Sequence, residues 1–286
     1  MIKLPRILVS GADGQLGQSM KAIQEAYTSS YEIIYLSQSD LDITSSSNIQ
    51  AVFEKYKPDF FFNFAAYTQV DLAEENKEEA FLINSTACAF LGQHCATFNT
   101  HLVHISTDYV YPGNGPNPYQ EEQAGSPLNQ YGASKLSGEQ AIQQSNAAYT
   151  IIRTSWLYSI FGSNFVKTMY KLGMERDVLN VVDDQIGSPT WTQDLIHAIF
   201  NLIQLKATGV YNFSNEGICS WYDFAKKIMD YKGINCQIHP ISTDAFPRPA
   251  ERPPFSVMDK AKYKSVTGSD IPQWDKALLK MLSNLE

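Results

Sequence analysis

Short apolar runs alternate with segments of helical periodicity through the first half of the chain. The apolar runs cover residues 6–10, 32–36, 59–64, 101–106 and 150–153, and the helical segments cover 15–27, 47–57, 77–98 and 131–144. Strands that are apolar throughout and alternate with helices are typical of a parallel sheet covered on both faces. The pattern therefore predicts an α/β fold with a Rossmann-like, doubly wound parallel sheet.

The pattern becomes less regular after Asn180. It still predicts helices over 192–205 and 220–232 and a strand over 209–213, and residues 246–254 contain four prolines. We expect residues 1–180 to form a dinucleotide-binding domain and residues 181–286 a smaller C-terminal substrate-binding lobe, interleaved with the sheet. The segment 111–128, rich in Pro, Gly, Asn and Gln, follows the fourth predicted strand. Because such loops tend to cover sites, we expect this segment to cover the site.

Three glycines with the spacing Gly11-x-x-Gly14-x-x-Gly17 follow the first strand and open the first helix. In that context backbone N–H groups and the helix N-terminus face a pyrophosphate. We expect the loop residues to bind a dinucleotide: Gly11, Asp13, Gly14, Gln15, Leu16 and Gly17. A glycine-capped turn without a ligand is the simpler alternative.

The chain does not indicate which nicotinamide cofactor it binds. An acid at the end of the second strand favours NAD, and a nearby Arg accepts the phosphate of NADP, but Ser37-Gln38-Ser39 occupies this place. We therefore expect NADPH or NADH. Asp42 and Ile43 are expected beside the adenine, and Ala65, Ala66 and Tyr67 beside the cofactor.

Tyr131 and Lys135 are spaced so that both lie on one face of a helix. A free tyrosine has a pKa of about 10, and a nearby ammonium group can lower it. Tyr131 is therefore a candidate acid and Lys135 its partner, which can also bind the nicotinamide ribose. Thr107, at the end of the fourth strand, can donate a hydrogen bond to the same carbonyl oxygen, with Ser106 as its competitor.

Composition and charge narrow the possible partners. The net charge of −8 argues against nucleic acid as the main partner, and no apolar run is long enough to span a bilayer. We expect a cytoplasmic protein without membrane contact. The four cysteines form no CxxC pair and are expected to be buried thiols. His101 and His104 lack nearby Cys, Asp or Glu partners, so we predict that they are structural and that no metal is bound.

Five motifs together resemble the extended short-chain dehydrogenases and, more narrowly, the dTDP-4-dehydrorhamnose reductase family. They are the glycine loop, Ser106-Thr-Asp-Tyr-Val-Tyr-Pro-Gly113, Tyr131-Gly-Ala-Ser-Lys135, Arg153-Thr-Ser-Trp-Leu-Tyr158 and Asp184-Gln-Ile-Gly-Ser-Pro-Thr190. The resemblance covers nearly the whole chain. Two departures concern cofactor choice: Ala12-Asp13 precedes the second glycine, where the family often carries Lys or Asn, and Ser37 stands where some members carry an acid.

The resemblance implies the following roles. Thr107, Tyr131 and Lys135 are catalytic, and Tyr131 is the proton donor. Thr107 and Asp108 contact the sugar, with Trp156 packing beside it. The cofactor channel is lined by Asn63, Ala65, Ala66 and Tyr67.

The expected function is reduction of the C4 ketone of dTDP-4-dehydro-L-rhamnose, a nucleotide-sugar substrate, by hydride transfer from NAD(P)H. Two alternatives stay open: a reductase of another nucleotide 4-keto-6-deoxysugar, and a non-catalytic regulatory subunit resembling the methionine adenosyltransferase beta subunit. A homodimer is possible. Arg248 and Arg252 are candidates for binding the nucleotide diphosphate, with a solvated surface role as the alternative.

Overall fold

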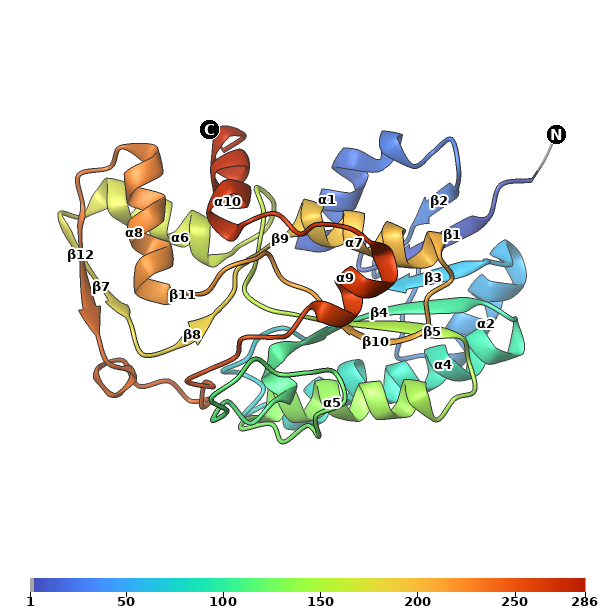
Figure 1. The fold of residues 1–286 in the computed structure, drawn as a ribbon. Helices are drawn as coiled ribbons and strands as arrows, with labels where there is room; N and C mark the ends of the chain where they lie inside the picture. Colours follow the sequence, from blue (N-terminus) through green and yellow to red (C-terminus); the bar gives the residue numbers. More distant parts are fainter. Residues whose placement is uncertain (1–2, 286) are drawn as a thin grey trace.

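A computed structural model describes residues 3–285, which form a layered sheet domain with a smaller lobe beside it (Figure 1). The central sheet has six parallel strands in the order β10-β5-β4-β3-β1-β2. They are β1 (Arg6–Ser10), β2 (Glu32–Tyr35), β3 (Phe60–Asn63), β4 (His101–Thr107), β5 (Tyr149–Thr154) and β10 (Gly209–Asn212). The predicted Rossmann-like doubly wound fold is confirmed.

Helices cover both faces of this sheet, as the apolar strands require. Helices α1 (Gln15–Ile23) and α7 (Thr192–Gln204) pack on one face, and α2 (Ser46–Tyr56), α4 (Ala87–Thr97) and α5 (Gln130–Gln143) on the other (Figure 1). Alternate strand residues supply the two cores: Val9 and Phe62 face α1 and α7, whereas Leu8 and Phe61 face the opposite layer. Both faces are thus buried, which explains the continuous apolar runs.

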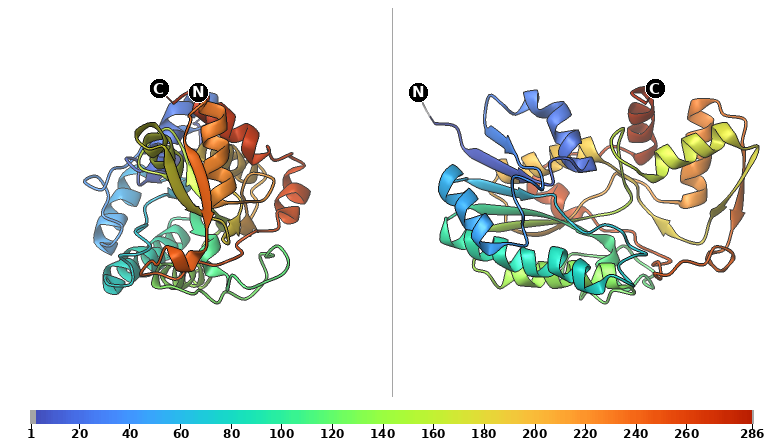
Figure 2. Two further views of the ribbon diagram at one scale, coloured as in Figure 1. Left: turned by 90° about the vertical axis from the view of Figure 1, so that its left-hand side faces the viewer. Right: turned by 180° about the vertical axis from the view of Figure 1, so that it is seen from behind.

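The smaller lobe is built mainly from the second half of the chain and has its own core. Figure 2 shows it from two further directions. It contains α6 (Phe165–Glu175), α8 (Trp221–Lys232), α10 (Trp274–Ser283) and the parallel pair β7 (Val178–Val182) and β12 (Gln237–Ile241). Short strand pairs join β6 (Leu157–Tyr158) to β9 (Thr190–Trp191), and β8 (Ile186–Gly187) to β11 (Cys219–Ser220). The remaining helices are α3 (Lys77–Phe81), the π-helical turn η2 (Leu82–Thr86), α9 (Ala261–Thr267) and the short 3₁₀ turns η1 (Gln24–Ala26), η3 (Asp108–Val110) and η4 (Thr243–Ala245).

The strand order reverses between β1 and β3, and this point positions the site. β1 lies between β2 and β3, so the connections on its two sides run in opposite directions. In open parallel sheets, ligands bind in the crevice beyond the carboxyl ends of the strands at such a switch point. The register places Ser10 opposite Asn63, Asn63 opposite His104, and Thr107 opposite Thr154 at this edge.

The predicted elements of the first half are confirmed, with ends shifted by a few residues. One predicted helix, 77–98, is a helical run of α3, η2 and α4, with a π-helical turn in its middle. In the second half the predicted α7, α8 and β10 are present. The elements α6, β7, α9, α10 and β12 were not predicted.

Candidate active site

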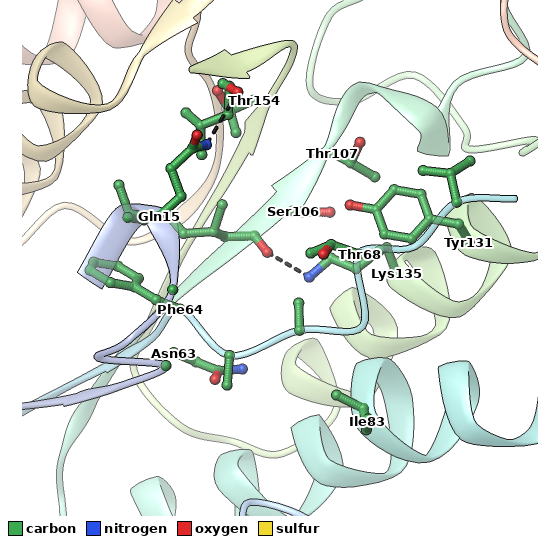
Figure 3. A pocket seen from close by; sticks show the side chains of 18 of the residues that line it. Gln15, Asn63, Phe64, Thr68, Ile83, Ser106, Thr107, Tyr131, Lys135 and Thr154 are labelled. Carbon is green, nitrogen blue, oxygen red and sulfur yellow. Dashed lines mark hydrogen bonds between the residues drawn. The ribbon is translucent and has the colours of Figure 1, made fainter. Parts of the chain in front are cut away.

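A cavity of about 1050 Å³ lies at the carboxyl ends of β1, β3, β4 and β5, facing the small lobe. Its wall includes most of the residues that the sequence predicts for the site: Gly11, Asp13, Gly14, Gln15, Leu16, Asp42, Ile43, Asn63, Ala65, Ala66, Thr107, Asp108, Tyr131, Lys135 and Trp156. The chain thus brings the glycine loop and the Tyr131 helix to one cavity (Figure 3).

The glycine loop forms one end of the cavity, and its backbone needs glycine. Gly11 has φ +66°, a conformation that residues with a Cβ rarely adopt, and a Cβ there would lie 2.6 Å from the Ala65 nitrogen. A Cβ on Gly14 would lie 3.2 Å from the Gly11 carbonyl oxygen. The loop therefore packs tightly against the end of β3 and leaves its outer side open to a ligand.

The N-terminus of α1 is suited to an anion. No side chain caps it, and its first turn has no acidic residue. By contrast, Ser45, Asn129, Asn164 and Ser220 cap α2, α5, α6 and α8 with side-chain oxygens. Free backbone N–H groups and the helix dipole favour a phosphate at this end. The glycine loop and the uncapped N-terminus of α1 fit the pyrophosphate of a dinucleotide.

Two residues predicted to bind the cofactor do not line the cavity. Gly17 lies under the loop, where a Cβ would come within 2.5 Å of the Gly11 carbonyl oxygen. The absence of a side chain at Gly17 allows α1 to pack closely against the loop. Gly17 therefore supports the loop without lining the cavity. Tyr67 is buried: its backbone nitrogen donates to Asn84 Oδ1 at 2.9 Å, and its ring packs with Ala73 and Ala80. The turn after β3 directs this side chain inward, so the expectation that Tyr67 borders the cofactor is corrected.

The end of the cavity near β2 contains hydroxyl, amide and carboxylate groups. Asp42 Oδ1 accepts from the nitrogen of Thr44 at 2.9 Å and from its hydroxyl at 2.6 Å. Ser37 donates from its hydroxyl and its backbone nitrogen to Asp40 Oδ2, at 2.6 and 2.9 Å. Among the described residues that line the cavity, Lys135 is the one Lys or Arg. No guanidinium group among these lining residues is therefore in place to bind a 2′-phosphate.

Tyr131 stands in the first turn of α5, with its hydroxyl directed toward Ser106 and Thr107 (Figure 3). Burial raises the pKa of Tyr131 to about 12, the hydrogen bond with Thr107 opposes this, and the charge of Asp108 adds to it. The phenol therefore keeps its proton at neutral pH. A group that donates a proton to an oxygen must hold it beforehand, and Tyr131 meets this condition.

Lys135 lies one helical turn further along α5 and is almost fully buried. Its Nζ donates to the carbonyl oxygen of Ile105 at 2.6 Å and lies 3.2 Å from His104 Nε2. These are the nearest acceptors in the buried site, so the ammonium turns toward β4. In this arrangement the hydrogen bond with Thr107 is what opposes the raised pKa of Tyr131.

Ser106 and Thr107 differ in what their hydroxyls contact. Ser106 Oγ donates to Glu139 Oε1 at 2.5 Å, and Glu139 forms a buried ion pair with Arg153 at 2.6 Å. Thr107 Oγ1 donates to Asp108 Oδ1 at 3.0 Å and also contacts Tyr131. Both residues line the cavity, but the Ser106 hydroxyl is held by the Glu139 and Arg153 pair. This arrangement favours Thr107 as the partner of Tyr131.

Asp108 and Trp156 form the wall on the substrate side. Burial raises the pKa of Asp108 to about 6, and hydrogen bonds oppose this only in part. Trp156 has φ +47° and stacks on Trp221, with ring centroids 3.6 Å apart. A Cβ on Gly187 would lie 2.8 Å from the Trp156 ring. The indole is thus fixed between the two, with its remaining surface on the cavity.

Neither the segment 111–128 nor the two candidate arginines line the cavity. No residue of 111–128 is among the described residues that line the cavity. The segment is tied to the C-terminal part of the chain, for example by Tyr119 N to Val257 O at 2.9 Å, so the expectation that it covers the site is wrong. Arg252 makes two hydrogen bonds to Asp71, at 2.5 and 2.9 Å, and Arg248 lies 3.7 Å from Asp71. Neither arginine lines the cavity.

Several lining residues escaped the sequence analysis. They include Thr68, Ile83, Tyr109, Ser155 and Trp221. For Trp221 the sequence contains a signal: Ser220 and Asp223 form a capping box, which places Trp221 in the first turn of a helix. Ile83 lies in the π-helical turn, a form often found at functional sites but not readable from sequence.

Across residues 3–285, no helix is both long and apolar enough to cross a membrane. The same residues contain no group of three or more His, Cys, Asp or Glu side chains that could hold a metal ion. All four cysteines are buried and free, as predicted.

Known proteins match this chain along nearly its full length. The RmlD substrate binding domain family matches residues 5–286. A spore coat polysaccharide biosynthesis protein of Bacillus subtilis is 40% identical over 255 residues, covering 89% of each chain. Two proteins are 34% identical: a dTDP-4-dehydrorhamnose reductase of Aggregatibacter actinomycetemcomitans, with 96% of this chain and 97% of the other covered, and a dTDP-4-keto-6-deoxy-D-glucose reductase of Streptomyces niveus, with 96% and 95% covered.

A solved structure is also closely similar. The dTDP-4-dehydrorhamnose reductase of Bacillus anthracis, crystallised in complex with NADP, superposes with a TM-score of 0.95 and is 39% identical. The alignment covers 99% of this chain and all of the other.

Proposed function

This chain belongs to the RmlD substrate binding domain family, and on that premise we propose that it reduces the C4 ketone of dTDP-4-dehydro-L-rhamnose to give dTDP-L-rhamnose. NADPH or NADH supplies the hydride when bound. The observation that carries the proposal is that a full-length family match coincides with a single cavity holding the glycine loop, Thr107, Tyr131 and Lys135.

The residues of the chain have distinct tasks in this proposal. The glycine loop and the uncapped end of α1 bind the pyrophosphate, and Lys135 orients the nicotinamide ribose. Thr107 holds the ketone oxygen, and Tyr131 gives its phenolic proton to that oxygen as the carbonyl is reduced. Asp108 and Trp156 bind the sugar. A phenol with a pKa of about 12 gives its proton to a strong base, and the forming alkoxide is one.

The assay that tests the function uses several substrates side by side. The protein is incubated with enzymatically made dTDP-4-dehydro-L-rhamnose, and separately with other nucleotide 4-keto-6-deoxysugars, while the loss of NADH or NADPH absorbance is followed. We expect the highest kcat/KM with dTDP-4-dehydro-L-rhamnose. A higher kcat/KM with another ketosugar would identify that ketosugar as the substrate and leave the proposed chemistry unchanged.

The Streptomyces niveus relative supports that second candidate, a reductase of another nucleotide 4-keto-6-deoxysugar, because it matches this chain as fully as the Aggregatibacter reductase does. Absence of turnover with every ketosugar would instead favour the regulatory subunit. The complete set of Thr107, Tyr131 and Lys135 in the cavity counts against a regulatory role.

The cytoplasmic location and the homodimer stay predictions. Light scattering coupled to size exclusion would measure the mass of the particle in solution, and fractionation of cells that produce the protein would give its location. A particle with the mass of a single chain of 32.1 kDa would contradict the dimer.

A further inference from the structure

Behind Lys135, three polar side chains continue a buried line from the lysine, and the proposed reaction does not use these three directly. His104 Nε2 lies 3.2 Å from Lys135 Nζ, and His104 Nδ1 lies 3.1 Å from the side-chain amide of Asn63. On the far side of that amide, Ser10 Oγ lies 2.8 Å from Asn63 Oδ1. All four residues are at most 2% exposed. The line starts at β1 and crosses β3 and β4 to reach α5.

We propose that His104 is a positioning residue for Lys135: a neutral imidazole that carries its proton on Nδ1 and accepts a hydrogen bond from the Lys135 ammonium at Nε2. This inference rests on the proposed function, because it assigns a task to the residue behind the catalytic lysine. The sequence indicates only a structural role for His104. The proposal assigns which of its ring nitrogens carries the proton.

The donors and acceptors around Lys135 lead to this assignment. An ammonium group has three N–H donors and no acceptor. Ile105 O accepts one of them at 2.6 Å, and His104 Nε2 lies where a second must point. The third donor remains for the cavity, which Tyr131 also lines and where the ribose of the cofactor would bind in the proposed function. Two fixed hydrogen bonds thus aim the third.

The proton on the ring must then sit on Nδ1. If Asn63 Nδ2 donated to His104 Nδ1, the ring proton would be on Nε2 and would face the ammonium of Lys135, donor against donor. With the amide turned so that Asn63 Oδ1 accepts from Nδ1–H, every contact pairs a donor with an acceptor. Asn63 Nδ2 then donates to Ser10 Oγ. Amide orientation and histidine tautomer are inferred from such networks.

The surroundings keep His104 neutral. Burial lowers its pKa well below the ordinary value, and the charge of Lys135 lowers it further. The other groups facing the pair are the Cys88 thiol of α4, about 4.0 Å from the ring nitrogens, and Glu139 of α5. Burial lowers the pKa of Lys135, and the interactions with Cys88 and Glu139 oppose this shift. A protonated imidazole would place two cations side by side in a buried site.

The first experiment reads the tautomer in the unaltered protein. The five histidines are labelled with ¹⁵N, and the His104 ring is assigned by comparison with His104→Gln. We expect one protonated nitrogen at Nδ1 and one unprotonated nitrogen at Nε2 at neutral pH. A proton on Nε2, or on both nitrogens, would overturn the proposal. This result does not depend on any substrate, so it stands apart from failure of the proposed function.

The second experiment compares His104→Phe with His104→Gln. Phe keeps a ring but removes the acceptor, whereas the Gln side-chain oxygen can reach the place of Nε2. Because a hydrogen bond to a charged group is lost, His104→Phe should weaken NADPH binding and lower kcat by roughly ten- to hundredfold. His104→Gln should recover most of both.

The two variants also separate positioning from simple packing. NADPH affinity is measured by fluorescence titration, and melting temperature is measured on the same samples. If His104→Phe binds NADPH within twofold of the unaltered protein, the proposal is wrong. It is also wrong if His104→Gln is folded and as impaired as His104→Phe. If His104→Phe fails to fold, the tautomer measurement and the NADPH affinity of His104→Gln still test the proposal.

Discussion

At the scale of single residues, the site is governed by burial more than by direct charge. The Tyr131 phenol and the Asp108 carboxyl both have a raised pKa, and in each case desolvation is the largest cause. The cavity therefore favours protonated, neutral groups close to the reacting oxygen. Desolvation makes ionisation of both groups more costly in the cavity than in water.

Tyr131→Phe removes the proposed acid and keeps the ring. Loss of a general acid should lower kcat by about 10²–10⁴, while NADPH affinity stays close to that of the unaltered protein. Steady-state kinetics and a fluorescence titration measure the two quantities. If the variant keeps more than about half of the activity, Tyr131 is not the acid.

Asp108 should give the protein a pH-dependent stability. Its pKa is about 6 in the folded chain and 3.8 in the reference state, so the folded form binds the extra proton. The contribution of Asp108 to stability is complete below about pH 3.8 and is lost as pH rises through about 6. Asp108→Asn should therefore gain stability relative to the unaltered protein over this interval, by roughly 3 kcal/mol in total.

Urea denaturation at pH 4 and pH 8 tests this difference. Asp71→Asn is the matched control, because the hydrogen bonds from Arg252 hold the pKa of Asp71 below its usual value. Because the folded pKa of Asp71 lies below 3.8, that variant should be less stable than the unaltered protein by nearly the same amount at pH 4 and at pH 8. A pH-independent difference for Asp108→Asn would contradict the assignment.

At the scale of secondary structure elements, sequence patterns foretold the sheet domain far better than the lobe. Strands β1, β3, β4 and β5 are apolar runs in which almost every residue is buried, so each leaves a local signal. In contrast, β8 and β9 have two residues each, and β7 and β12 are half exposed and depend on each other. Such elements are set by tertiary pairing, which a single sequence does not display.

The site shows the same division. The glycine spacing and the Tyr131 and Lys135 spacing could be read directly, because each reflects one turn of backbone. The inward direction of Tyr67, the contact of Lys135 with His104, and the stack of Trp156 on Trp221 could not. Each depends on residues that are distant in the sequence and are brought together only by the fold.

Gly17→Ala tests how the loop and α1 fit together. The new Cβ would lie 2.5 Å from the Gly11 carbonyl oxygen, a backbone atom that cannot move without shifting the loop. NADPH affinity should fall at least tenfold, about 1.4 kcal/mol. Isothermal titration calorimetry measures it.

Gly173→Ala is the control for this change. It also lies within a helix, but its Cβ would meet the Met229 side chain, which is flexible and can move aside. NADPH affinity should be unchanged. Equal losses in the two variants would mean that the effect comes from general destabilisation.

At the scale of the whole molecule, the substrate wall is formed where the sheet domain meets the lobe. Trp156 follows β5 of the sheet, and Trp221 opens α8 of the lobe. Gln15, after the glycine loop, accepts from Asn164 at 2.9 Å, at the start of α6. The two parts are therefore connected at the cofactor end and at the substrate end of one cavity.

Trp156→Ala should raise KM for the nucleotide sugar by roughly ten- to hundredfold, because an aromatic surface of the wall is lost, and should leave KM for the cofactor nearly unchanged. Steady-state kinetics with each substrate varied in turn measures both. Trp191→Ala is the control: this tryptophan is buried in the lobe core and does not line the cavity. It should cost about 3–5 kcal/mol of stability without changing KM for the sugar. An unchanged KM in Trp156→Ala would refute the substrate role.

The path of the chain through the sheet has a consequence for how the protein folds. After β5 the chain leaves the sheet, builds β6, α6 and β7 to β9, and returns through α7 to place β10 beside β5. This pairing closes a long loop, and closing long loops is slow. We expect the amides of β10 to become protected late in refolding, after those of β1 and β3, in pulsed hydrogen exchange. A nascent chain would then complete the edge of its sheet only when much of the lobe already exists.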